Sequence, residues 1–302
     1  MARTQLQSTH HNGNRRPEDH SPLVHPRPHH PPPPLTRADH HRLDESRAQR
    51  ILWLLEELNL PYDIEIYHRV ALEAPASLRK IHPLGKSPIL TLQPAGAPSP
   101  IVLAESGFIT SYLTSHFATG ALSTLVPRKW KPGQEGQVGG ETEAWMRHEY
   151  LLHYNEGSLF PLIVTKLILD IFSSSLVPFF VRPLVGFVAG KIIGQYIFPN
   201  GRKHLGMLED MLKNVPRDGA EGGEGGEGEG KYLCGNKLTA ADILMGFGLV
   251  AAKLKWADAG PWKGSIEEEF PEVFAYLARL EAEEGYKRSV KKVEELEKSN
   301  AK

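Results

Sequence analysis

The sequence predicts a small α/β domain followed by an all-α domain. Short apolar runs between residues 62 and 103 are separated by Pro/Gly turns and flanked by helical patterns, which is typical of a mixed sheet with helices. Beyond residue 140 the apolar periodicity is helical throughout. The chain has 302 residues, enough for two such domains. We therefore expect an α/β domain over 40–118, a linker over 119–140 and an all-α domain over 141–290.

Composition excludes several classes of function. The formal net charge of -1 argues against nucleic acid as a partner. Cys234 is the one cysteine, so no intrachain disulfide can form, and this fits a reducing compartment. The first thirty residues are polar and lack the apolar core of a signal peptide, so we expect a cytoplasmic protein.

Residues 1–39 are rich in His and Pro and contain few aliphatic side chains. Such a segment buries too little apolar surface to offset its ordering entropy, so we expect a disordered tail. Its histidines have irregular spacing, which favours a polar tail over a metal site. We expect no bound metal ion.

The first helix and strand follow this tail. Ile51, Leu54, Leu55 and Leu58 have helical spacing, and Ser46 with Gln49 forms a capping-box pattern that predicts a helix start at Ser46. Tyr62, Ile64 and Ile66 then alternate as a strand.

A central strand before Ser46 is the weak point of the prediction. The residues available are LTRADHHRL, from 35 to 43, and few of them are apolar. Buried His40, His41 and Arg42 would each need partners. We therefore suspect that the first 40 residues are a divergent start joined to an otherwise intact domain.

The stretch 81–113 is the most informative. It reads as a strand, a turn, a second strand and a helix start. Pro88 opens the first strand, and the Ser87–Pro88 bond is a candidate cis peptide. Such a bond would expose the main-chain N–H and C=O of Ser87. An extended peptide could then pair with them in the way that an added β-strand does.

After the second strand comes Glu105-Ser106. Ser106 occupies the expected N-cap of a helix, where free N–H groups favour a carboxylate. Glu105 adds a negative charge beside that anion site. The pair suits a zwitterion with an α-carboxylate next to an α-ammonium. An ordinary hairpin with a capped helix is the alternative.

KSPIL followed by LAESGFI resembles the glutathione-binding half of glutathione S-transferases, and LDESRAQRILWLLEELNL resembles their fungal branch. The resemblance implies a thioredoxin-like N-terminal domain and an all-α C-terminal domain. It implies that Lys86, Ser87 and Pro88 hold the cysteinyl part of glutathione, and that Glu105 and Ser106 hold its γ-glutamyl end.

The resemblance makes Ser46 the catalytic residue, with its hydroxyl facing the glutathione sulfur. A free thiol has a pKa of about 8.5, and its thiolate is the nucleophile. A hydroxyl donor at a helix start favours that thiolate. Ser46 as a simple N-cap is the alternative. Serine rather than cysteine here argues against thiol transfer and reductive dehalogenation.

The second half carries three further features. YNEGSL, from 154 to 159, resembles the same fungal branch, and Thr239 with Asp242 forms a capping box flanked by a Leu238–Ile243 hydrophobic staple. Residues 159–198 are strongly apolar, but charged residues and prolines interrupt any membrane-spanning run. We expect a flexible acidic loop over 217–230, a charged tail over 291–302 that is either helical or frayed, and Cys234 in the core rather than as a nucleophile.

The resemblance implies conjugation of glutathione to hydrophobic electrophiles, as in detoxification and stress response, by a homodimer that needs glutathione as co-substrate and no permanent cofactor. A peroxidase side activity stays open. So do a non-catalytic binding or regulatory module, and peripheral association with the endoplasmic reticulum membrane.

Overall fold

The computed structural model describes residues 35–43, 47–68, 74–217 and 230–300. The expected His/Pro-rich tail before residue 35, the catalytic candidate Ser46 and the core of the acidic loop at 218–229 lie outside the described residues.

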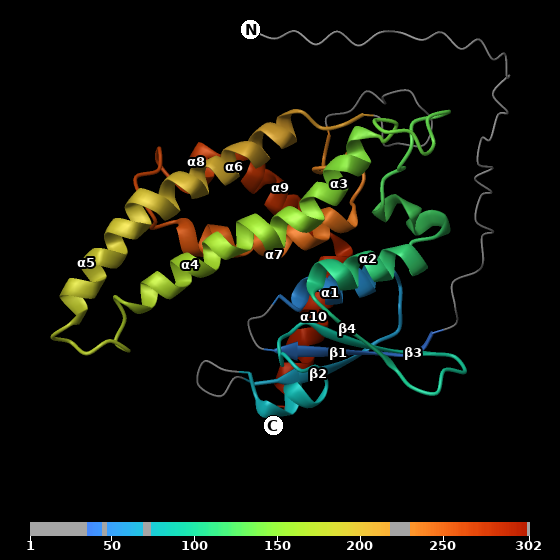
Figure 1. Ribbon diagram of the computed structural model, residues 1–302, viewed down its shortest axis with the longest axis horizontal. Coiled ribbons are helices and arrows are strands. Elements are labelled where there is room, and N and C mark those ends of the chain that lie inside the picture. Colours follow the sequence, from blue (N-terminus) through green and yellow to red (C-terminus); the bar gives the residue numbers. More distant parts are fainter. Residues whose placement is uncertain (1–34, 44–46, 69–73, 218–229, 301–302) are drawn as a thin grey trace, which may run out of the picture. The chain divides into compact units, whose positions relative to one another are not determined.

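The N-terminal domain is built on a four-stranded sheet with the order β2-β1-β3-β4 (Figure 1). β1 pairs in parallel with β2 and antiparallel with β3, and β3 pairs antiparallel with β4. This is the thioredoxin-like arrangement that the sequence predicted. The elements are β1 (Leu35–Leu43), α1 (Gln49–Glu57), β2 (Asp63–Tyr67), a 3₁₀ turn (Ala76–Lys80), β3 (Ile89–Pro94), β4 (Ile101–Ala104) and α2 (Ser106–Phe117).

The polar segment that the sequence analysis suspected does form the central strand. β1 spans Leu35–Leu43, so the sheet begins before residue 40. Ala38 and His40 are fully buried on it. β1 pairs with β2 over Asp39–Leu43 and with β3 over Leu35–His41, and this pairing of its backbone compensates for its low apolar content.

The start of the first helix differs from the expected one. α1 begins at Gln49, and Arg47 and Ala48 form a turn before it. The side-chain Nε2 of Gln49 donates a hydrogen bond of 2.8 Å to Ser289 Oγ on α10. The Gln49 amide nitrogen is therefore bound to α10, and Ser46, the other half of the expected capping box, lies outside the described residues.

The C-terminal domain is helical. A 3₁₀ turn (Gly120–Leu125) precedes it in the linker, and two π-helical segments interrupt its long helices. Its elements are α3 (Glu143–Tyr154), a π segment (Asn155–Leu159), α4 (Phe160–Ile171), α5 (Arg182–Ile192), a π segment (Ile193–Ile197), α6 (Phe198–Lys213), α7 (Ala240–Trp256), α8 (Ile266–Glu269), α9 (Pro271–Ala282) and α10 (Glu284–Asn300).

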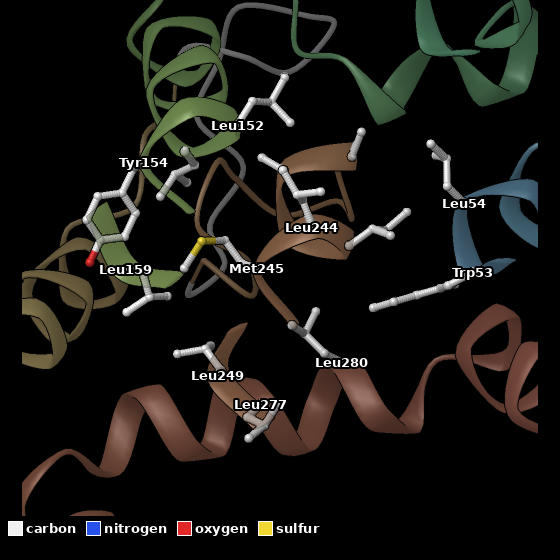
Figure 2. Close-up of a cluster of buried hydrophobic side chains, with 14 of the residues drawn as sticks. Trp53, Leu54, Leu152, Tyr154, Leu159, Leu244, Met245, Leu249, Leu277 and Leu280 are labelled. Atoms are coloured by element: carbon white, nitrogen blue, oxygen red, sulfur yellow. The ribbon is translucent and has the colours of Figure 1, made fainter. Parts of the chain in front are cut away.

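One hydrophobic core joins the two domains. Side chains from α1, α3, α7 and α9 meet around Leu244 and Met245 of α7 (Figure 2). Trp53 of α1 takes part and is 2% exposed. Gly246 of α7 leaves room for the Trp53 side chain, because a Cβ at Gly246 would lie only 3.2 Å from the Trp53 ring. The shared core holds α1 against the helical domain.

Helix α10 packs against the first domain. Of the two forms expected for the charged segment from residue 291, the described residues form the helix, because α10 continues to Asn300 and packs on α1 (Figure 1). Arg288 Nε donates to Glu56 Oε2 at 2.9 Å, and Val293 is buried. Among the described residues, no helix has the length and apolarity that a membrane crossing requires.

Candidate functional site

Ser87 and Pro88 lie at the entrance of β3. The Ser87–Pro88 peptide bond is cis, as the sequence predicted. Both residues are buried, whereas Lys86 beside them is exposed. Gly85 turns the chain into this segment with a φ of 55°, and a Cβ there would come within 2.7 Å of Arg79 Cγ, so glycine fits this turn.

Glu105 and Ser106 lie where β4 passes into α2. The structure corrects one detail: Glu105 occupies the N-cap, without a side-chain capping bond, and Ser106 is the first helical residue. The reason is the backbone of Glu105, whose φ of 70° turns the chain sharply into the helix. This conformation leaves the Glu105 carboxylate exposed and buries Ser106 to 2% exposure.

These five residues line one small pocket. Lys86, Ser87 and Pro88 form one side, and Glu105 with Ser106 forms another. The sequence analysis assigned these five residues to one site, and in the fold they do lie around one pocket. Arg47, the residue after Ser46, lines the same pocket, as do His82, Leu84 and Ala104.

Sequence reasoning missed a charged cluster behind Ser106. The Arg50 guanidinium is 1% exposed, and its Nη2 donates to Ser106 Oγ at 3.0 Å and contacts Glu156 Oε1 at 2.5 Å. Arg47 Nη1 reaches Glu156 Oε2 at 2.6 Å. The available signal was Arg50 itself, because position 50 shares the apolar face of α1 with Leu54, four residues on.

Arg50 is held between the domains. Its Nη1 donates to the Leu244 carbonyl of α7 at 3.3 Å, and its guanidinium lies over the rings of Phe160 and Phe247. Burial lowers the pKa of Arg50 to about 10, although the charge of Glu156 opposes this. Arg50 therefore stays cationic at neutral pH.

Cys234 is a core residue, as the sequence predicted. The side chain is 3% exposed, and burial raises the pKa of its thiol well above the usual range, with the nearby charge of Asp242 adding to the effect. A thiol in this environment stays protonated and is a poor nucleophile. Within the described ranges, no cluster of His, Cys, Asp and Glu side chains could hold a metal ion.

A sheet of this order, a cis-proline turn and a helical second domain define a thioredoxin-like two-domain architecture. Comparison with protein families agrees: residues 46–116 match the N-terminal domain of glutathione S-transferases, and residues 195–291 match their C-terminal domain. The chain is 34% identical over 258 residues to glutathione S-transferase 1 of Saccharomyces cerevisiae, covering 85% of this chain and 95% of the yeast protein. The chain belongs to the glutathione S-transferase family.

Other relatives share the fold. Glutathione S-transferase 3 of Schizosaccharomyces pombe is 29% identical over 74% of this chain and 77% of its own length. Among solved structures, the glutathione transferase URE2P8 of Phanerochaete chrysosporium, crystallised with oxidized glutathione, has a TM-score of 0.58 at 16% identity and covers 86% of this chain and 96% of its own. A transferase of Methylobacillus flagellatus with glutathione bound has a TM-score of 0.55 at 14% identity, over 83% and 98%.

Proposed function

We propose that this protein is a glutathione transferase that binds glutathione in the pocket between Ser87 and Ser106. The observation that carries the proposal is the convergence of Lys86, Ser87, Pro88, Glu105 and Ser106 on one pocket. Three of them match chemical features of the tripeptide. An extended cysteinyl unit pairs with main chain at Ser87, the α-ammonium meets the Glu105 carboxylate, and the α-carboxylate meets Ser106 at the start of α2.

Ser46 is the proposed catalytic residue. It precedes Arg47, which lines the pocket, and a hydroxyl donor there stabilises the thiolate of glutathione. The thiol proton passes to solvent, the sulfur forms a bond to an electrophilic carbon, and the leaving group departs with its electron pair. The electrophile is hydrophobic, and peroxide reduction is the second reaction to test. A solved neighbour, Ure2p5 of Phanerochaete chrysosporium, was cocrystallised with a glutathionyl-dinitrobenzene conjugate, which supports an aromatic electrophile as the first substrate.

The experiment is glutathione-affinity capture followed by turnover with a chlorodinitrobenzene, other electrophiles and organic peroxides. Capture and conjugation together support the proposal, and a protein that neither binds nor conjugates contradicts it. The rival function, a non-catalytic binding or regulatory module, predicts capture without turnover and no thiolate signal in the complex.

We also propose a cytoplasmic homodimer. Large apolar side chains are exposed along α4, α5 and their connection, among them Leu176, Phe179 and Phe180, and exposed apolar surface of this extent marks interaction sites. Light scattering of the purified protein should give twice the chain mass. A monomer that floats with lipid vesicles would instead favour peripheral association with a membrane such as that of the endoplasmic reticulum.

A further inference from the structure

The hydrogen bond between Arg50 and Ser106 determines which way the serine hydroxyl can act. A guanidinium only donates hydrogen bonds, so Ser106 Oγ accepts from Arg50 Nη2 at 3.0 Å. The hydroxyl proton of Ser106 is then available to donate. Within the described part of the chain, no other side-chain hydrogen bond of Ser106 competes for it. Ser106 is thereby set as a donor toward an anion in the pocket.

Arg50 in turn depends on Glu156 of the helical domain. Both carboxylate oxygens of Glu156 are used, one by Arg50 Nη2 at 2.5 Å and one by Arg47 Nη1 at 2.6 Å. The two guanidiniums lie over the same Phe160 ring, at 5.3 and 5.6 Å from its centroid. Two cations this close repel each other, so the carboxylate between them fixes both in place.

Local backbone geometry brings Glu156 to this position. Asn155–Leu159 is a π-helical segment, a feature that often marks functional sites, and it packs on α7 at Gly248. A Cβ at Gly248 would lie 2.5 Å from Asn155 Oδ1, so this close approach requires glycine. Asn155 Nδ2 also donates to Glu156 Oε1 at 2.9 Å, which orients the carboxylate.

We propose that Glu156 is a positioning residue for glutathione: it holds Arg50, and Arg50 sets the Ser106 hydroxyl as donor to the γ-glutamyl carboxylate. This inference rests on the proposed function. It means that the helical domain contributes to the affinity of a site whose ligand-contacting residues lie in the thioredoxin-like domain.

The test is a double-mutant cycle on the full chain, with glutathione affinity measured by calorimetry. Glu156→Gln removes the charge at nearly constant volume, and Ser106→Ala removes the hydroxyl. We expect each to raise the Kd for glutathione roughly tenfold, equivalent to about 1.4 kcal/mol. The double variant should be no weaker than the weaker single variant, because both changes remove the same interaction. Turnover at saturating glutathione should change far less than KM.

A ligand-side change makes the test sharper. A glutathione analogue that lacks the γ-glutamyl α-carboxylate cannot accept a hydrogen bond from Ser106. We expect wild-type protein and Glu156→Gln to bind this analogue with equal affinity. Additive effects in the cycle, an unchanged or lowered Kd in Glu156→Gln, or an equal loss with the analogue would each overturn the inference.

Two further variants exclude a purely structural effect. Arg288→Ala breaks an ion pair with Glu56 that also joins the two domains but lies away from the pocket, and it should leave the Kd for glutathione unchanged. An equal loss in Arg288→Ala would assign the effect to domain docking and overturn the inference. Glu156→Asp keeps the charge but shortens the reach by one methylene. It should fold and lose part of the affinity, and if Glu156→Gln does not fold, an unchanged Kd in Glu156→Asp overturns the inference.

The outcome also separates this inference from the proposed function. Wild-type protein that does not bind glutathione contradicts the proposed function itself. Wild-type binding that Ser106→Ala weakens and Glu156→Gln leaves intact contradicts only the role of Glu156.

Discussion

Glu105 has a φ of 70° at the junction of β4 and α2, a conformation that non-glycine residues rarely adopt. Backbone strain of this kind costs about 1–3 kcal/mol and is concentrated at functional sites. Here it aims an exposed carboxylate at the pocket while the next residue, Ser106, is buried. Stability and ligand affinity should therefore respond in opposite directions to substitution at position 105.

Glu105→Gly should raise the melting temperature, because glycine adopts this φ without strain, and should raise KM for glutathione, because the charge is lost. Glu105→Gln isolates the second effect: it keeps the strain and loses a charge-assisted hydrogen bond worth roughly 1.5–3 kcal/mol. Thermal melts and initial rates at varied glutathione check both. Unchanged KM in both variants would remove Glu105 from the site.

For single residues, the sequence was informative where the candidate site is formed by short local motifs. Ser87, Pro88, Glu105 and Ser106 are close in sequence to the turns that position them, so their convergence could be predicted. The contact of Arg50 with Glu156 joins residues 106 positions apart, and no local pattern encodes such a pairing. Only the interdomain packing places them together.

Helix α7 begins with the capping box that the sequence predicted. Asp242 is fully buried and accepts hydrogen bonds from the backbone N–H groups of Leu233 and Thr239, from the Thr239 hydroxyl, and from the Tyr276 hydroxyl. Burial raises the pKa of this carboxyl, although these hydrogen bonds act in the opposite direction. The box ties the start of α7 to α9, so its role is structural.

Thr239→Ala should lower the free energy of unfolding by about 0.5–2 kcal/mol, the range for a lost cap. Thr239→Ser keeps the hydroxyl and should retain most of the stability. Urea denaturation of both variants measures this. Turnover per folded molecule should match wild type in each. A loss of turnover with an unshifted denaturation midpoint would instead place this motif in the active site.

The sequence predicted the type of most elements in the described chain, but it was less informative about β1 and about element boundaries. β1 was doubted because LTRADHHRL has little strand-like apolarity, yet neighbours on both sides make it a central strand. The expected start of α1 at Ser46 rests on a local capping pattern, and such patterns fix a helix end only to within a few residues. The β1 difference is an effect of tertiary contacts on a weak local signal.

At the scale of the whole molecule, contacts between α10 and α1 join the helical domain to the first domain. Glu56 accepts hydrogen bonds from Tyr62 at 2.6 Å and from Arg288 at 2.9 Å. Burial would raise the pKa of Glu56, but these two hydrogen bonds, together with the positive charges of Lys292 and Arg288, outweigh it and hold the pKa below its usual range. Lys292 lies over the Tyr62 ring at 3.5 Å from its centroid and extends the contact.

This lowered pKa predicts a pH-dependent contribution to stability. Because the pKa is lower in the folded state, the contribution is complete above the unfolded value of about 4.3 and is lost as the pH falls through the folded value. Glu56→Gln should therefore be less stable than wild type by roughly 1 kcal/mol at about pH 7, and by less at about pH 3. Glu272→Gln, an exposed change on α9, is the control. A wild-type to Glu56→Gln difference that is constant with pH would contradict this account.

In the proposed mechanism the pocket binds glutathione as a thiolate with the help of Ser46. A titration of thiolate absorbance in the glutathione complex measures this, with the complex of S-methylglutathione as the baseline. We predict that wild-type protein lowers the thiol pKa below its free value of about 8.5. We also predict that Ser46→Ala returns it toward that value and slows conjugation near neutral pH. Titration curves that overlay for the two proteins, or a wild-type complex with the pKa of free glutathione, would contradict the claim.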